Sequence, residues 1–396
     1  MSNKKLCKGG RFFSVIILIA LGFALALGAL VSLSKLYPAK AAPASQPVPQ
    51  NTTPNEVCLG CHSKSGMTTE MPNGEVLPLT IVEQDFHDSV HGENEIACVS
   101  CHTNIDGFPH PEKTADSLRG FTLENYTTCK QCHEEQYLKT LDSVHQKALA
   151  GGNNNAAVCT DCHNPHYQER LTDPSTGELT PEARVKIPET CARCHNSIYE
   201  KYKTSVHGSA LIGEGNPDVP TCIDCHGVHN IADPTTSEFR LKSPTEMCGK
   251  CHTDESRMSK YGISTNVLNT YVGDFHGTTV IFEQQSPDQE TNKPVCYDCH
   301  GIHDIKNVND PQSGIAIKAN LLVKCERCHG DSIPAGFTDA WMSHYTPSPK
   351  DYPLVYFINV FYLIFIPFVL GGMLIFVISD IMRRIIDRRK KGASHQ

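Results

Sequence analysis

The sequence predicts a chain of loops and short α-helices with little strand, wrapped around an interior that its own side chains do not fill, with one or two transmembrane helices. Three observations indicate this fold class. The 396 residues include 19 cysteines, many more than core packing in an ordinary soluble protein uses. Hydrophobic residues are 39% of the chain, but two apolar runs near its ends hold many of them. The chain also has 25 prolines and 28 glycines, so its middle favours loops over a conventional core.

The first apolar run, residues 12–33, follows four basic residues and precedes the small-x-small sequence Ala39-Lys40-Ala41. Residues 1–41 are therefore either a cleaved signal peptide or an uncleaved N-terminal membrane anchor, and both direct the chain out of the cytoplasm. Residues 42–57 are rich in Pro, Ala and Thr, which predicts a linker. Cys7 lies before the first run, where we expect an ordinary free thiol.

The second apolar run, residues 354–379, contains no charge and is followed by six arginines and lysines. It predicts a transmembrane helix over residues 353–381 and a basic cytoplasmic tail over residues 382–396. The segment between the two runs is then held at the cell (inner) membrane, on the periplasmic or extracytoplasmic side.

The motif Cys-x-x-Cys-His occurs nine times and uses 18 of the 19 cysteines. Two thiols at this spacing reach the two vinyl groups of one haem, and the adjacent imidazole then points at the iron. Disulfides and zinc sites are the alternatives for paired cysteines, but neither explains a histidine after every second cysteine. The sequence therefore predicts nine covalently bound haems c. The cofactor-binding cysteines are Cys58, Cys61, Cys98, Cys101, Cys129, Cys132, Cys159, Cys162, Cys191, Cys194, Cys222, Cys225, Cys248, Cys251, Cys296, Cys299, Cys325 and Cys328, and the motif histidines, as proximal iron ligands, are His62, His102, His133, His163, His195, His226, His252, His300 and His329.

Lone histidines recur at matching positions in a repeat of two motifs, so residues 58–345 form about 4.5 two-haem units. One set precedes the second motif of each unit and is introduced by similar words, such as Asp-Ser-Val-His; the other set follows the second motif. Together they supply one distal imidazole for each of nine irons, which predicts bis-histidine ligation. The first set is His91, His145, His207, His276 and His344, and the second is His110, His166, His229 and His303.

Two other histidines lie outside these sets. His87 precedes His91 closely, so it can exchange with His91 or replace His110, and the pairing of lone histidines with individual motifs stays open. His395 lies in the polar tail, where we expect no ligand role. Short helices are expected between His133 and His145 and again before His207, and Asp-Pro pairs predict turns between units.

Residues 58–345 resemble the multihaem cytochromes c of respiratory electron transfer, and more specifically the haem domain of inner-membrane cytochrome b/c quinone oxidoreductases. The resemblance implies closely stacked haems that act as a wire. The fused form of that family carries further membrane helices with haem-b histidines. Because a single C-terminal span is seen here, we expect a separate cytochrome b or quinone-interacting subunit as partner, together with other redox proteins.

The predicted function is electron transfer between a membrane quinol or cytochrome b partner and extracytoplasmic acceptors. The alternative is a multihaem reductase or dehydrogenase, which keeps an open iron, and nine distal candidates for nine irons leave none. A sensory or structural haem protein is a third alternative. The net charge of −8 disfavours nucleic-acid binding. Electrons should come in at the ninth motif, 25 residues before Leu354, with His344 as its distal ligand.

Overall fold

The computed structural model describes residues 53–105, 107–286, 292–331, 333–334, 336–340, 344, 346–350 and 352–393. These residues belong to one unit of the chain, Gln50–Gln396. The predicted N-terminal run, Cys7 and His395 lie outside the described residues.

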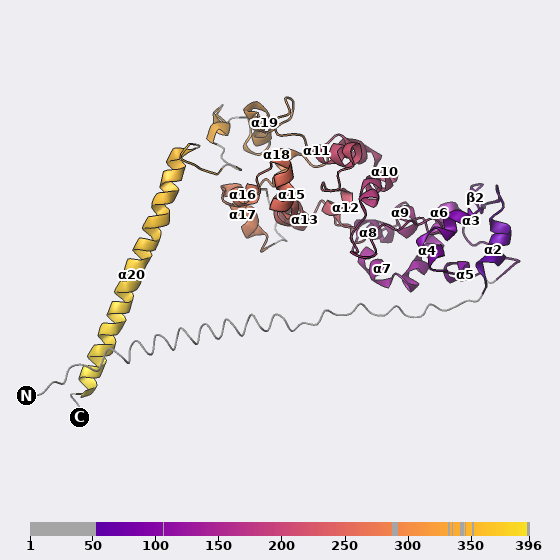
Figure 1. Ribbon diagram of the computed structural model, residues 1–396, viewed down its shortest axis with the longest axis horizontal. Coiled ribbons are helices and arrows are strands. Elements are labelled where there is room, and N and C mark those ends of the chain that lie inside the picture. Colours follow the sequence, from indigo (N-terminus) through magenta and orange to yellow (C-terminus); the bar gives the residue numbers. More distant parts are fainter. Residues whose placement is uncertain are drawn as a thin grey trace, which may run out of the picture. The chain divides into compact units, whose positions relative to one another are not determined.

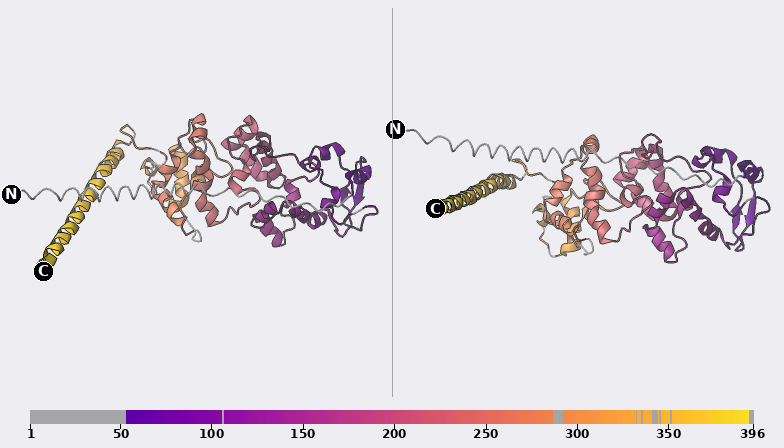
Figure 2. Two further views of the ribbon diagram at one scale, coloured as in Figure 1. Left: turned by 60° about the horizontal axis from the view of Figure 1, so that its bottom comes forward. Right: turned by 90° about the horizontal axis from the view of Figure 1, so that it is seen from below.

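The described chain before residue 350 consists of short helices joined by loops (Figures 1 and 2). The only named strands among the described residues, β1 (Thr68–Glu70) and β2 (Val76–Pro78), pair antiparallel, with Thr68 opposite Pro78. The predicted fold class is confirmed. The helices are α2 (Asn55–His62), α3 (Glu83–His87), α4 (Val90–Glu93), α5 (Cys98–Cys101), α6 (Leu118–Asn125), α7 (Glu134–Thr140), α8 (Val144–Ala150), α9 (Cys159–Cys162), α10 (Pro181–Lys203), α11 (Val206–Gly208), α12 (Cys222–His226), α13 (Ser237–Lys242), α14 (Gly249–His252), α15 (Glu255–Met258), α16 (Val267–Val272), α17 (Phe275–Glu283), α18 (Cys296–His300), α19 (Lys318–His329) and α20 (Pro353–Ala393).

The hydrophobic core is sparse, as the composition predicts. Leu241, Val280 and Val295 form a buried cluster, with Tyr297 packed against it. Other buried apolar residues are scattered along the chain. A domain of this length ordinarily needs a far larger apolar interior, so side-chain packing alone does not account for its stability.

A repeated helix start carries His91, His145, His207 and His276, the lone histidines that precede the second motif of a unit. Ser89, Ser143 and Ser205 are 2–3% exposed, and each hydroxyl accepts a hydrogen bond from the backbone N–H three residues on. Asp274 caps α17 in the same way. A capping side chain stabilises the first turn, and the histidine two residues later lies in that turn. The short sequences that recur before these histidines therefore supply the N-cap residues of the helices.

The predicted short helices and inter-unit turns are present. Helix α7 lies between His133 and His145, and α8 carries His145 in its first turn. Helix α10 crosses the fifth motif with a non-helical residue at His195. After Asp173 and Asp233, the aspartate accepts hydrogen bonds from the backbone N–H two residues on, which is an Asx-turn.

Helix α20 has 41 residues, and its segment Pro353–Arg388 contains an 18-residue apolar window with a mean hydropathy of 2.6. It is the one helix among the described residues that is long and apolar enough to cross a membrane, and its side chains in that apolar window are not buried. The helix continues through Pro367 and beyond residue 381, so the described part of the predicted basic tail is helical too. It is compatible with a membrane anchor.

Candidate haem-binding sites

Every motif histidine faces one lone histidine. The nine pairs have ring centres 5.9–6.3 Å apart. In the order of the motifs, the pairs are His62 with His110, His102 with His166, His133 with His91, His163 with His229, His195 with His145, His226 with His303, His252 with His207, His300 with His344, and His329 with His276.

The spacing of these pairs fits one metal ion between two imidazoles. A metal–imidazole bond is about 2 Å long and the ring centre lies roughly 1 Å behind the bonded nitrogen, so two axial imidazoles have centres about 6 Å apart. No group of three or more His, Cys, Asp or Glu side chains that could hold a bare metal ion occurs in the described ranges. Two facing imidazoles beside a Cys-x-x-Cys pair suit a haem iron, whose other four ligands come from the porphyrin.

Hydrogen bonds fix several imidazoles in the tautomer that ligation needs. The Nδ1 atoms of His62 and His91 lie 2.8 and 2.9 Å from the carbonyl oxygens of Leu79 and Pro165. His344 Nδ1 lies 3.1 Å from the carbonyl oxygen of Val267. A ring that donates its Nδ1 proton to a carbonyl leaves Nε2 as a lone-pair donor for a metal, and such partners orient ligating histidines in known metal sites.

Burial favours the neutral form of the ligand candidates. Burial, together with a smaller repulsion from His252, lowers the pKa of His207 to about 4. Burial likewise lowers the pKa values of His166 and His300 to about 4. These imidazoles are uncharged at neutral pH, as a metal ligand must be.

Consecutive units exchange histidine ligands, and we call each such contact between two units a joint. At a joint, the lone histidine before the second motif of one unit faces the leading motif of the next. The lone histidine that follows the second motif of that next unit, which we call the returning histidine, faces back to the second motif of the previous unit. At the third joint, for example, His207 faces His252 while His303 faces His226. Each site at a joint therefore needs residues from two units.

A backbone hydrogen bond repeats at the first three joints. The N–H of the valine before the lone histidine, which has no partner within its own helix, donates to a carbonyl two residues beyond the returning histidine. The donors and acceptors are Val90 to Gln168 at 2.9 Å, Val144 to Ile231 at 3.0 Å and Val206 to Ile305 at 2.8 Å.

The two ends of the array are closed differently. His110 faces His62 within the first unit. His344 faces His300 of the eighth motif, whereas His329 of the ninth faces His276. The expectation that His344 serves the ninth motif is therefore not met. His344 follows the ninth motif, and it occupies the place of a returning histidine.

His87 stays outside the nine pairs. Its Nε2 lies 3.7 Å from a carboxylate oxygen of Glu83, and both side chains are about half exposed. Among the alternatives that the sequence left open, the geometry favours His91 and His110 over His87.

The thiols of successive motifs lie close together in chain order. The first cysteines of the two motifs interact with each other in each of the four two-motif units, as Cys58 does with Cys98 in the first. Between units, Cys101, Cys162, Cys225 and Cys299 each interact electrostatically with cysteines of the next motif. All eighteen motif cysteines are free of disulfides. The nine sites thus follow one another from the first motif to the ninth.

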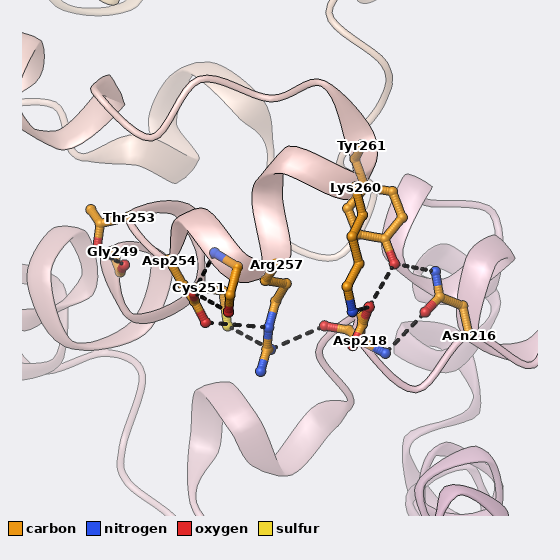
Figure 3. Close-up of polar contacts among 10 residues, drawn as sticks. Asn216, Asp218, Gly249, Cys251, Thr253, Asp254, Arg257, Lys260 and Tyr261 are labelled. Atoms are coloured by element: carbon orange, nitrogen blue, oxygen red, sulfur yellow. Dashed lines mark hydrogen bonds and ion pairs between the residues drawn. The ribbon is translucent and has the colours of Figure 1, made fainter.

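Polar contacts also link the sixth and seventh motifs (Figure 3). Arg257 donates to the Sγ of Cys251 at 3.3 Å and to the backbone carbonyl of Asp218 at 3.1 Å. Lys260 and Tyr261 both bind the Asp218 carboxylate, at 2.7 and 3.1 Å. The segment after the seventh motif is therefore tied to the loop that precedes the sixth.

Sequence reasoning missed the glycine that follows several lone histidines. A Cβ at Gly208 would collide with the backbone carbonyl of Tyr202, and a Cβ at Gly277 would collide with that of Tyr271. The helix turn that carries the histidine packs directly on the preceding chain at these places. The recurring His-Gly pair was the available signal, although the second unit has Gln146 instead of glycine.

Buried nitrogens without a partner give a second indication of a missing group. The Nε atoms of Arg184 and Arg240 are buried and have no hydrogen-bond acceptor among the described residues. Buried donors are normally paired, and the propionates of a haem are suitable acceptors. The donor set therefore fits a haem as well as the histidine pairs do.

Among curated proteins, the chain is 26% identical over 211 residues to the multiheme cytochrome MtrA of Shewanella baltica (strain OS185). The alignment covers 48% of this chain and 59% of the relative, so the chain spans about three fifths of the length of the curated relative it matches. The similarity supports a multihaem c-type cytochrome. It supports haem c as the cofactor and electron transfer as the general function. No protein-family profile matches the chain. No solved structure matches it.

Proposed function

We propose that residues 58–345 bind nine haems c, each with its iron between one motif histidine and one lone histidine, and pass electrons from one haem to the next. The observation that carries this proposal is the set of nine facing histidine pairs at about 6 Å. When bound, haem supplies an iron that cycles between the ferric and ferrous states, one electron at a time. The chain supplies both axial ligands and the order of the sites.

Saturated irons favour an electron carrier over an enzyme. A reductase needs an iron with a replaceable sixth ligand, and each motif histidine among the described residues has an opposing imidazole. The closeness of the thiols of successive motifs supports a single path from the first haem to the ninth.

We further propose that the chain works at the inner membrane with its haem domain on the periplasmic or extracytoplasmic side. Residues 1–41 would direct export, residues 42–57 would link, residues 353–381 would span the bilayer and residues 382–396 would remain in the cytoplasm. The basic residues that follow the apolar part of α20 support this orientation. A membrane quinol or a cytochrome b subunit would reduce the haem of the ninth motif, and other redox proteins outside would accept the electrons.

Intact-mass spectrometry and low-temperature electron paramagnetic resonance of the protein purified from membranes test the haem assignment. We expect nine haem additions that survive denaturation and only low-spin ferric signals. Fewer additions in fully matured protein would overturn the count, and a stoichiometric high-spin signal would favour the enzyme alternative.

The proposed donor side has its own test. A chain cut after residue 350 that keeps an uncleaved N-terminal anchor should be reduced much more slowly by a menaquinol analogue in membranes than the full chain. Equal rates would show that electrons come in elsewhere.

A further inference from the structure

An arginine–aspartate pair recurs in three consecutive units. The closest nitrogen–oxygen distances are 2.9 Å for Arg119–Asp161, 2.7 Å for Arg184–Asp224 and 2.7 Å for Arg240–Asp298. Each aspartate directly precedes the second cysteine of the fourth, sixth or eighth motif, and each arginine precedes the leading motif of the same unit. The pair therefore connects the two haem motifs of one unit.

The same groups also bind the backbone around the second motif. Arg184 donates to the carbonyl of Val219 at 3.0 Å, and Arg240 donates to that of Lys293 at 2.8 Å. Arg119 donates to the carbonyl of Asn154 at 2.6 Å. Each aspartate accepts the backbone N–H three residues before it, as Thr221 donates to Asp224 at 2.8 Å. We call this arrangement the Arg–Asp clamp.

The first unit makes the same connection without charge. Asn55 donates to the carbonyl of Ile96 at 3.1 Å and accepts from the N–H of Cys98 at 2.8 Å. Ser100 stands where the other units have aspartate. The backbone tie is thus common to all four units, whereas the ion pair belongs to the second, third and fourth.

We infer that the Arg–Asp clamp is a positioning and charge-balancing group, in which the arginine offsets the effect of the aspartate on the reduction potential of the haems at the fourth, sixth and eighth motifs. The inference rests on the proposed function. A carboxylate beside a haem stabilises the ferric iron and lowers its potential, while a guanidinium raises it. The side chains of Arg184 and Asp224 are 17% and 29% exposed, so solvent screens them less than it screens surface charges. In the intact clamp the two effects largely cancel.

Redox titration of the full-length protein, followed at the haem α-band, separates this role from a purely structural one. Arg184→Gln leaves the aspartate unbalanced. For one haem in nine, the ratio of oxidised to reduced form at a given potential should therefore rise by up to about tenfold, which is a fall in reduction potential of about 59 mV for one electron. Asp224→Asn should raise the reduction potential of one haem. The double variant should return close to the wild-type curve.

Lys186→Gln is the matched control. Lys186 lies on the same helix, α10, and pairs with Glu169 at 2.6 Å, but the two side chains are 58% and 69% exposed. This surface pair should leave the titration unchanged. A shift of the same size in the control would show that any charge change on α10 moves the curve, which would overturn the clamp as its specific cause.

Intact mass and spin state are measured on each sample before titration. If the wild type lacks nine low-spin haems, the proposed function fails. If it has them and the two single variants shift in the same direction, or not at all, only the clamp is refuted. Should Arg184→Gln fail to accumulate with nine haems, Asp224→Asn decides alone, because its predicted shift is upward and a zero or downward shift contradicts the inference.

Discussion

The interior joints and the two ends of the haem array supply the second histidine of each pair in different ways. At an interior joint, two histidines cross between units, each from a helix turn or a loop anchored by its own hydrogen bonds. At the N-terminal end, His110 turns back within its own unit. The difference shows that an interior haem site is a property of two units, so one isolated unit does not complete its own ligand set.

The C-terminal end obtains its ligand at a conformational cost. His344 has φ 69°, in the left-handed region that a histidine rarely adopts, which costs roughly 1–3 kcal/mol. His91, His145, His207 and His276 lie instead in the first turn of N-capped helices. Hydrogen bonds from the surrounding chain offset part of the cost, since Asn266 donates to Thr346 at 2.8 Å and His344 Nδ1 approaches the carbonyl of Val267.

The largest expected effect comes from breaking an interior joint at His207. His207→Ala should convert one iron in nine to a high-spin or exogenous-ligand-binding form, because His252 would keep no opposing imidazole. It should also lower the thermal midpoint of the protein, since the joint loses a cross-unit bond. Electron paramagnetic resonance and cyanide binding measure the first effect, and calorimetry measures the second.

The identity of the opened site is tested by removing haem attachment in the same chain. Adding Cys248→Ala and Cys251→Ala should abolish the high-spin signal of His207→Ala, whereas adding Cys222→Ala and Cys225→Ala should leave it. The opposite result would contradict the pairing across the joint. His87→Ala is the control for histidine loss and should leave the spectrum unchanged.

The next effect concerns the C-terminal end. His344→Ala should also open one iron, but with a smaller loss of stability, because the variant relieves a left-handed residue as it removes the ligand. The high-spin signal should disappear when Cys296 and Cys299 are replaced by Ala. If replacing Cys325 and Cys328 abolishes it instead, His344 serves the ninth motif and the closure described for this end is wrong.

The sequence predicted the components of these sites better than their connections. The nine motifs and the nine lone histidines can be recognised as short recurring sequences, because covalent haem attachment and N-caps require particular residues at fixed spacing. Which lone histidine faces which motif depends on how the units pack, and no short sequence motif encodes this pairing. His344 shows the limit: the residues before it resemble those before His91, His145 and His207, but it lies opposite His300. The Arg–Asp pairs are also non-local, although the repeated aspartate before the second cysteine was a readable signal.

A smaller effect distinguishes joints that have glycine after the lone histidine from the one that has glutamine. Gly208→Ala should destabilise the protein by roughly 1–3 kcal/mol, because the new methyl group meets the carbonyl of Tyr202 and forces the histidine-bearing turn away from the chain. Gln146→Ala, at the matching place in the second unit, should change stability by a few tenths of a kcal/mol at most. Denaturant titration measures both, and equal effects would show that close packing is not what requires the glycine.

The smallest effect is expected at the buried serine caps that precede His91, His145 and His207 at the first three joints. Ser205 is 2% exposed, and its hydroxyl accepts the N–H of Gly208 at 2.9 Å. Ser205→Ala removes this acceptor and should cost about 1 kcal/mol, with all nine irons remaining low-spin because His207 keeps its other contacts. Ser205→Asp places a capping carboxylate in the same position but buries a charge, so it should be worse than alanine. At the cap position of Thr180 on α10, which is only partly buried, aspartate should be tolerated. Denaturant titration of the four proteins, including the wild type, gives the order. If Ser205→Asp proves as stable as the wild type, the cap is open to solvent and the interior joints are looser than the hydrogen bonds at Val206 and Gly208 indicate.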